Sequence, residues 1–262
     1  MATPPSGEQF ELAFGDQRAT VVEVGGGLRT YAVGDRQVLD GYPVDEMCTS
    51  ARGQVLAPWP NRLIDGTYEW EGEQLQVPLN NREQENAIHG LVRWANWAAV
   101  ERDPSRVVME HVLHPQPGYP FTLRLRVDYR LGADGLTVST TAENAGERAC
   151  PFGIGHHPYI AAPSGRVDDL VVDGEPIGAQ KLDDSRRMDA PWRMQIDDVT
   201  VWADVAWRHV QLFTGDLLAD VDRRSFAVEP MTCPPNAFRT GEDLIRLEPG
   251  ETFAGTWGIT VS

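Results

Sequence analysis

The stretch TLRLRVDYRL, residues 122–131, decides the fold class of this chain. Every second position in it is apolar: Leu123, Leu125, Val127, Tyr129 and Leu131. Successive side chains of a strand point to opposite faces of a sheet, so this alternation predicts a half-buried β-strand. A turn sequence, GADG at 132–135, is followed by LTVSTTAEN at 136–144, and the two together predict an antiparallel hairpin.

Similar short strand patterns recur along the chain. They are ELAFGDQRATVVEV (11–24), GTYEWEGEQLQVP (66–78), HVQLFTG (209–215) and ETFAGTWGITVS (251–262). In the last of these, Phe253, Trp257, Ile259 and Val261 share one face, with Gly255 between them. Apolar stripes at helical spacing are interrupted by Gly or Pro. We therefore predict an all-β fold, a twisted antiparallel sandwich, organised as a single domain over residues 1–262.

The composition narrows the function classes. The chain has 262 residues, 41% of them hydrophobic, with 8 Trp, 25 Gly and 19 Pro, and a formal net charge of -16. Nucleic acids and anionic membranes attract clustered Lys and Arg, so this charge argues against both as partners. The opening sequence MATPPSGEQ is polar, and no apolar stretch is long enough to span a bilayer. The expected location is the cytoplasm.

The three cysteines favour neither a disulfide framework nor a structural zinc site. Cys48, Cys150 and Cys233 are odd in number and widely spaced, and they form no CxxC pair. We expect buried thiols.

Ionisable groups gather in segments that break the strand pattern, where loops on a rigid scaffold commonly carry function. These segments are residues 57–68 (APWPNRLIDGTY), 86–97 (NAIHGLVRWANW), 153–163 (GIGHHPYIAAP) and 227–244 (AVEPMTCPPNAFRTGEDL). Taken alone, Arg62 is more simply a surface ion-pair partner, and His89 a histidine bonded to backbone at a turn. Glu229 follows a buried apolar run, where desolvation raises a carboxyl pKa; it is either a general base or an arginine's partner.

The adjacent histidines His156 and His157 do not form a promising metal site. Neighbours on a strand point to opposite faces, so at most one ring faces a given pocket. A metal would require His89 and a carboxylate to converge, and the chain contains no HxH or HExxH spacing. We expect no metal.

Together these segments resemble the aldose 1-epimerase (galactose mutarotase) family. NRLIDGTY with NAIHG is similar to its N-terminal signature, HPYI to its His-x-Tyr-Phe element, and VEPMTCPPNAF to the segment holding its catalytic glutamate. The order agrees, and the wording is closest to the bacterial aldose-epimerase-like branch. The resemblance implies a large antiparallel β-supersandwich that binds a sugar in an open cleft and uses no cofactor.

The resemblance also assigns roles. It implies that His157, two residues before Tyr159, is the catalytic acid and that Glu229 is the catalytic base. It implies that Arg62, His89 and Asp183 bind substrate hydroxyls, with Asp184 as an alternative to Asp183. In the bacterial branch, three further residues are candidates to line the cleft: Arg93, Trp94 and Trp97.

The function expected from these roles is interconversion of the α and β anomers of an aldose. His157 begins protonated and Glu229 ionised, and the pair opens and closes the sugar ring. The expected partner is a small sugar, and the protein is a monomer or a homodimer.

Other readings remain open at this stage. A hexose-6-phosphate 1-epimerase would need basic residues over the phosphate, such as Arg93, Arg186 or Arg187. A sugar-binding module on the same fold would lack the chemistry, and a metal-dependent enzyme would bind zinc or iron through its histidines. A glycosidase would need a second carboxylate beside Glu229, for which Glu242, Asp243 and Glu248 are the neighbours along the chain.

Overall fold

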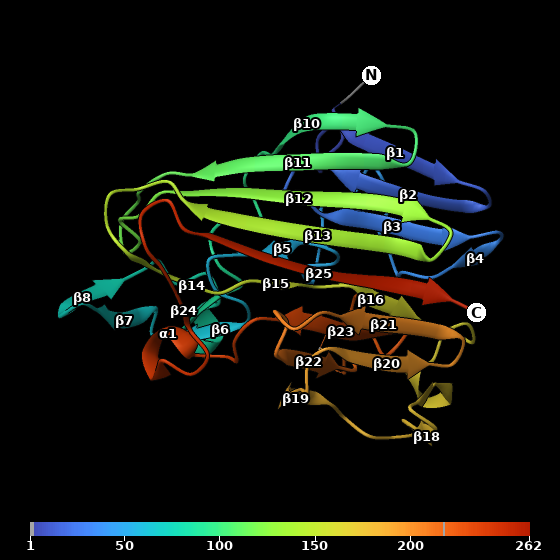
Figure 1. Ribbon diagram of the computed structural model, residues 1–262. Coiled ribbons are helices and arrows are strands. Elements are labelled where there is room, and N and C mark those ends of the chain that lie inside the picture. Colours follow the sequence, from blue (N-terminus) through green and yellow to red (C-terminus); the bar gives the residue numbers. More distant parts are fainter. Residues whose placement is uncertain (1–2, 217) are drawn as a thin grey trace.

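Strands dominate the computed structural model, which describes residues 3–216 and 218–262 (Figure 1). Within these ranges the helical elements are α1 (Ala237–Thr240) and two 3-10 turns, η1 (Arg82–Gln84) and η2 (Val167–Asp169). Every registered pair of strands is antiparallel, from β1 with β2 to β7 with β8. The predicted all-β class is confirmed.

A nine-stranded sheet forms the broad layer that runs across Figure 1. Its order is β10 (Ala98–Asp103), β11 (Arg106–Leu113), β12 (Leu123–Gly132), β13 (Gly135–Asn144), β25 (Thr252–Val261), β21 (Val199–Ala203), β20 (Trp192–Ile196), β17 (Val171–Val172) and β18 (Glu175–Pro176). The predicted hairpin is β12 with β13, paired from Leu123 opposite Asn144 to Gly132 opposite Gly135.

The alternation read from the sequence matches the burial of β12. Its five apolar residues from Leu123 to Leu131 are all buried, whereas Arg124 and Arg130 are exposed. The predicted last strand is β25, which lies between β13 and β21 and buries Trp257 and Ile259. The buried face of this sheet is therefore formed by the residues that the apolar–polar alternation in the sequence predicted to face the core.

The remaining strands form two further sheets and three isolated pairs. A four-stranded sheet contains β1 (Gln9–Phe14), β2 (Gln17–Val22), β3 (Leu28–Val33) and β4 (Arg36–Gln37). A six-stranded sheet has the order β19 (Asp183–Arg187), β22 (His209–Phe213), β23 (Ser225–Met231), β15 (Gly155–His156) and β5 (Val55–Leu56), and β16 (Tyr159–Ala161) also pairs with β23. The pairs are β6 (Arg62–Ile64) with β9 (Asn86–Ile88), β7 (Thr67–Trp70) with β8 (Glu73–Gln76), and β14 (Cys150–Phe152) with β24 (Ile245–Leu247).

The core lies between the sheets. His156 of β15 shows how closely they meet: its Nε2 lies 3.0 Å from the Thr140 hydroxyl on β13, and its ring centroid lies 5.3 Å from that of Trp257 on β25. The six-stranded sheet therefore packs on the nine-stranded one. One continuous apolar cluster extends from Phe10 on β1 to Ile259 on β25. These layers build the antiparallel β-sandwich that the sequence predicted.

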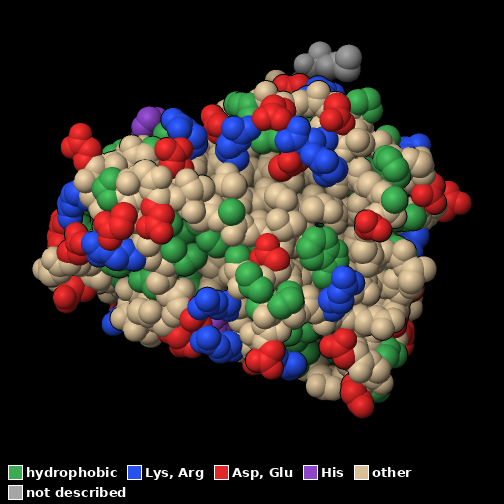
Figure 2. All heavy atoms as spheres, in the orientation of Figure 1, with side chains coloured by type: hydrophobic (Ala, Val, Ile, Leu, Met, Phe, Trp, Pro, Cys, Tyr) green, Lys and Arg blue, Asp and Glu red, His purple; other side chains and the backbone are tan. Residues whose placement is uncertain are grey.

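Charges of both signs are interspersed on the face shown in Figure 2, where no large basic patch appears. Binding of nucleic acid would require such a patch. No helix among the described residues is long and apolar enough to cross a membrane.

Candidate active site

Glu229 lies in β23, a wholly buried strand of the six-stranded sheet. All seven residues of β23 are buried, and Glu229 is 2% exposed. Its Oε1 lies 3.3 Å from Nε2 of His157, and its Oε2 has no hydrogen-bond partner among the described residues. A carboxyl group removed from water in this way is costly to ionise, so its position favours a chemical role over a structural one.

His157 follows β15 directly, and Pro158 separates it from β16. His156 turns into the core, whereas His157 turns to Glu229, as expected for adjacent residues on a strand. The Tyr159 ring stacks on the His157 imidazole with 4.8 Å between centroids and 13° between planes. The imidazole is therefore held by an aromatic ring against its face and by the carboxyl group at its Nε2.

Arg62 and His89 come from the paired strands β6 and β9. Arg62 lies opposite Ile88, and His89 follows with a φ of 64°. The turn at His89 brings its ring to 5.2 Å from that of His157, measured between centroids. The His89 Nδ1 is buried without a hydrogen-bond partner in residues 3–216 and 218–262. His89 does lie at a turn, but its Nδ1 does not form the hydrogen bond to backbone that the simpler interpretation of the sequence expected.

Asp183 is the first residue of β19, and its carboxylate faces Arg62. Arg62 Nη2 lies 3.5 Å from Asp183 Oδ2, and Gln211 Nε2 donates to Asp183 Oδ1 at 2.7 Å. Asp184, the next residue, instead accepts from Arg186 at 2.7 Å. Between the two aspartates left open by the sequence, it is Asp183 that reaches the cleft.

The five predicted site residues, Arg62, His89, His157, Asp183 and Glu229, line one cleft of about 260 Å³. Other residues that line the cleft were not predicted from the sequence; they include Asn61, Asn81, Gln84, Tyr159 and Gln211. Gln211 had a readable signal, because it is the polar residue in the otherwise apolar run of residues 210–213; in the structure it pairs with Glu229 on β23. Its Oε1 is also buried without a partner in the described chain, so polar groups converge on this cleft from several elements.

Burial changes the protonation expected for the central pair. Desolvation, with a smaller contribution from Asp183, raises the pKa of Glu229 well above its usual 4.5. Desolvation, reinforced by the Arg93 charge, lowers the pKa of His157 to about 3. The unliganded cleft thus favours the neutral acid beside neutral imidazole, whereas we expected carboxylate and imidazolium from the sequence. Both forms hold one proton between the two groups.

Comparison with known proteins identifies the family of this chain. The profile of the family described as aldose 1-epimerase matches residues 8–173. The chain belongs to the aldose 1-epimerase family. The uncharacterised protein YihR of Escherichia coli is 34% identical over 94% of this chain and 91% of its own.

Solved structures share the fold of this aldose 1-epimerase family member. A putative aldose 1-epimerase from Escherichia coli superimposes with a TM-score of 0.82 at 19% identity, covering 97% of this chain and 99% of its own. A galactose 1-epimerase from Lactobacillus acidophilus gives a TM-score of 0.75 at 16% identity, covering 94% and 92%. At these identities the likeness establishes the sandwich, and the family membership supports a sugar epimerase or mutarotase role.

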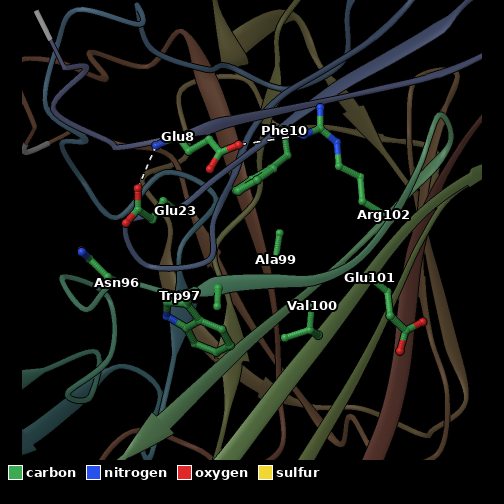
Figure 3. A pocket seen from close by; sticks show the side chains of 10 residues that line it. Glu8, Phe10, Glu23, Asn96, Trp97, Ala99, Val100, Glu101 and Arg102 are labelled. Carbon is green, nitrogen blue, oxygen red and sulfur yellow. Dashed lines mark hydrogen bonds and ion pairs between the residues drawn. The ribbon is translucent and has the colours of Figure 1, made fainter.

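Two tryptophans expected at the cleft lie elsewhere. Trp97 is 2% exposed and lies at the base of a separate groove beside β10, seen in Figure 3. In that groove the Glu23 carboxylate accepts a hydrogen bond from the Glu8 backbone N–H at 2.9 Å. This carboxylate is therefore already hydrogen-bonded within the protein. Trp94 is exposed and does not line the cleft, whereas Arg93 does. The expectation was wrong for Trp97 because its ring packs on Gly26, a contact that the local sequence does not reveal.

The basic pair Arg186 and Arg187 does not line the cleft either. Arg186 bonds to Asp184, and Arg187 bonds to Asp243 at 2.5 Å. The acidic residues Glu242, Asp243 and Glu248 are likewise not among the residues that line it. A dicarboxylate arrangement with Glu229 is therefore not built from that segment.

One group of side chains among the described residues has metal-ligand spacing: His209, Glu242 and Asp243. It lies outside the cleft, and Asp243 already accepts from His209 at 2.8 Å and from Arg187. All three cysteines are free and buried, as predicted, and burial raises the pKa of the Cys233 thiol to about 12. The cysteines therefore supply no nucleophile to the cleft, and the His209 group supplies no metal ligands to it.

The raised pKa of Glu229 predicts a pH-dependent cost in stability. Above its unfolded value of 4.5 the unfolded chain ionises while the buried carboxyl retains its proton, so the parent loses stability as pH rises toward the folded pKa. Glu229→Gln should remove this loss, gaining up to about 1.4 kcal/mol per pH unit above 4.5 and nothing below it. Urea unfolding of both proteins at about pH 4 and about pH 8 measures the difference. An equal gain at both values would contradict the assignment of the raised pKa.

Proposed function

We propose that this protein interconverts the α and β anomers of an aldose by acid–base ring opening and closure, without a cofactor. The observation that carries the proposal is the buried His157–Glu229 pair, with 3.3 Å between Nε2 and Oε1. Ring opening must deprotonate the C1 hydroxyl and protonate the ring oxygen, and both oxygens are bonded to C1. A base and an acid that serve them must therefore be close neighbours.

Glu229 is proposed as the base and His157 as the acid. Glu229 Oε2, which lacks a protein partner in the described residues, would accept the proton of the C1 hydroxyl while Nε2 of His157 gives its proton to the ring oxygen. The bond from C1 to the ring oxygen breaks, and C1 becomes an aldehyde carbon. Rotation about the bond from C1 to C2 presents the other aldehyde face, and reversed proton transfers close the ring.

The proton held by the pair can start on either group. The neutral acid and imidazole become carboxylate and imidazolium when one proton moves across the 3.3 Å contact. A sugar hydroxyl that donates to Oε2 stabilises the carboxylate, because hydrogen bonding to the charged form favours it. Substrate binding would thus move the pair toward the charged form in which the reaction starts.

Arg62, His89 and Asp183 are proposed to hold sugar hydroxyls through the ring-opened stage. They come from β6, the turn after β9, and β19, so they approach the cleft from separate elements. Fixing the open-chain sugar keeps its aldehyde near the pair and saves the entropic cost of recapturing it. The unpartnered His89 Nδ1 is available for such a contact.

Polarimetry of freshly dissolved α-D-glucose and α-D-galactose tests the proposal. The spontaneous rate is subtracted, and the parent is expected to accelerate the approach to anomeric equilibrium of at least one aldose. A protein that binds these sugars in a thermal-shift assay yet accelerates none of them would be a sugar-binding module on this fold, and the proposal would fail.

A further inference from the structure

Arg93 is a cleft-lining cation whose side chain has no hydrogen-bond or ion-pair partner among the described residues. It is half-buried, its Nε is shielded from solvent, and its guanidinium forms no hydrogen bond or ion pair with any residue in 3–216 or 218–262. Burial lowers its pKa, which shows that the site costs free energy for a cation. A guanidinium has five N–H donors, and in a protein interior these are normally satisfied.

The side chain is nevertheless held in place. Its Cζ lies 5.4 Å from the centroid of the Trp94 ring, and the Arg93 backbone carbonyl accepts from Gln54 Nε2 at 2.7 Å. An arginine stacked on an aromatic ring keeps the edge of its guanidinium free for hydrogen bonds. Arg93 is therefore a positioned donor group and not a mobile surface chain.

The other arginine that lines the cleft and the arginine behind its Tyr159 wall are both paired with carboxylates. Arg62 is opposite Asp183, and Arg52, behind Tyr159, pairs with Asp40 at 3.3 Å and Asp220 at 2.7 Å. Glu229 cannot neutralise Arg93, because burial favours its protonated form. Among the residues that line the cleft, Arg93 thus carries the positive charge that has no carboxylate partner, in a protein whose net charge is -16.

We propose that Arg93 binds an anionic group on the exocyclic carbon attached to C5 of the substrate, so that the preferred substrate is an acidic aldose. This inference rests on the proposed mutarotase function. A carboxylate, phosphate or sulfonate at this position would accept parallel hydrogen bonds from the guanidinium.

The place of the anion on the sugar follows from the place of Arg93 relative to the catalytic pair. The Arg93 backbone carbonyl accepts from Gln54, and the neighbouring Gly53 N–H donates to the His157 carbonyl at 2.9 Å, so Arg93 is anchored on the β5 side of β15. Glu229 is on β23, which lies on the opposite side of β15. Arg93 is therefore on the His157 side of the pair. With His157 at the ring oxygen and Glu229 at the C1 hydroxyl, the ring atom next to the oxygen on the far side from C1 is C5.

The test compares kcat/KM for mutarotation of glucose, glucuronate, glucose 6-phosphate and 6-sulfonated glucose. We expect at least one anionic sugar to exceed glucose by about 10-fold or more, and Arg93→Gln to lower that ratio by about 10- to 100-fold, as loss of hydrogen bonds to a charged group predicts. Arg93→Lys retains the charge without the paired donors and should fall between the two.

Arg82→Gln is the matched control. Arg82 lies on η1 between the lining residues Asn81 and Gln84, is exposed, and likewise forms no side-chain bond with the described residues. The change removes the same charge near the same cleft, and the ratio should remain within about twofold of the parent, because an exposed charge is screened.

The outcomes separate this inference from the function on which it rests. Turnover of glucose at least as fast as that of every anionic sugar, or an unchanged ratio in Arg93→Gln, would overturn the inference and leave mutarotation standing. Thermal shifts that are larger for an anionic sugar than for glucose, and are lost in Arg93→Gln, without turnover of either sugar, would uphold the anion site and sink the mutarotase proposal.

Discussion

Glu229→Gln is expected to lower kcat/KM for mutarotation by about 1,000-fold, within the range that general acid–base catalysis contributes. Glutamine has nearly the same shape, so it fits between β22 and β15 without a cavity, and its amide cannot take the proton of the C1 hydroxyl. The loss should appear in kcat, because the hydrogen bonds that hold the sugar remain. Initial rates by polarimetry at several sugar concentrations measure both parameters.

The stability of the same variant provides its control. Since glutamine removes the cost of a buried ionisable carboxyl, the variant should be folded and at least as stable as the parent at neutral pH. A folded Glu229→Gln protein with parental kcat would show that another group is the base. An unfolded variant is inconsistent with the desolvation argument, which predicts a gain in stability.

His157→Asn is expected to lower kcat/KM by about 100- to 1,000-fold, since the ring oxygen would leave without a proton donor of suitable pKa. Combined with Glu229→Gln, it should add little further loss, because the two groups handle one proton and act as a unit. A multiplicative loss in the double variant would contradict the shared-proton mechanism. His156→Asn is a poor control, because that ring is bonded to Thr140 in the core.

The pH profile of the parent follows from the same pair. The pair is active with one proton, so kcat/KM should fall on the acid side only as His157 gains a second proton, near its lowered pKa of about 3, and on the alkaline side as Glu229 loses its proton above its usual 4.5. An acid limb near 6.5, the ordinary value for histidine, would contradict the effect of burial on His157. In His157→Asn the acid limb should disappear and the residual activity should rise as Glu229 ionises, because without the histidine only the carboxylate can act as the base.

The parts of the fold that the sequence predicted are those set by local alternation. The hairpin of β12 and β13 was readable because a strand with one face in the core must place an apolar residue at every second position. The opposite directions of His156 and His157 were readable for the same reason. The parts that could not be read depend on contacts distant in sequence, such as Gly26 with Trp97, or Gln211 with Asp183.

Protonation was a second limit. The family resemblance identified Glu229 and His157 as the catalytic pair. Their charge states, however, depend on how completely β23 and the cleft walls exclude water, and burial reverses the form expected from ordinary pKa values. The absence of a carboxylate partner for Arg93 could not be predicted for the same reason. A sequence shows which arginines are present, but the fold decides which of them form ion pairs.

The position of β25 affects how the protein is made. Residues 252–261 are inserted between β13 and β21, so during synthesis β13 exposes an unpaired edge until that stretch has emerged from the ribosome. Such an edge is a template for pairing with another chain. Nascent chains are therefore most vulnerable to aggregation late in translation. At that stage the strands on both sides of β25, which are β10 to β13 on one side and β17, β18, β20 and β21 on the other, have been synthesised but β25 does not yet pair with them.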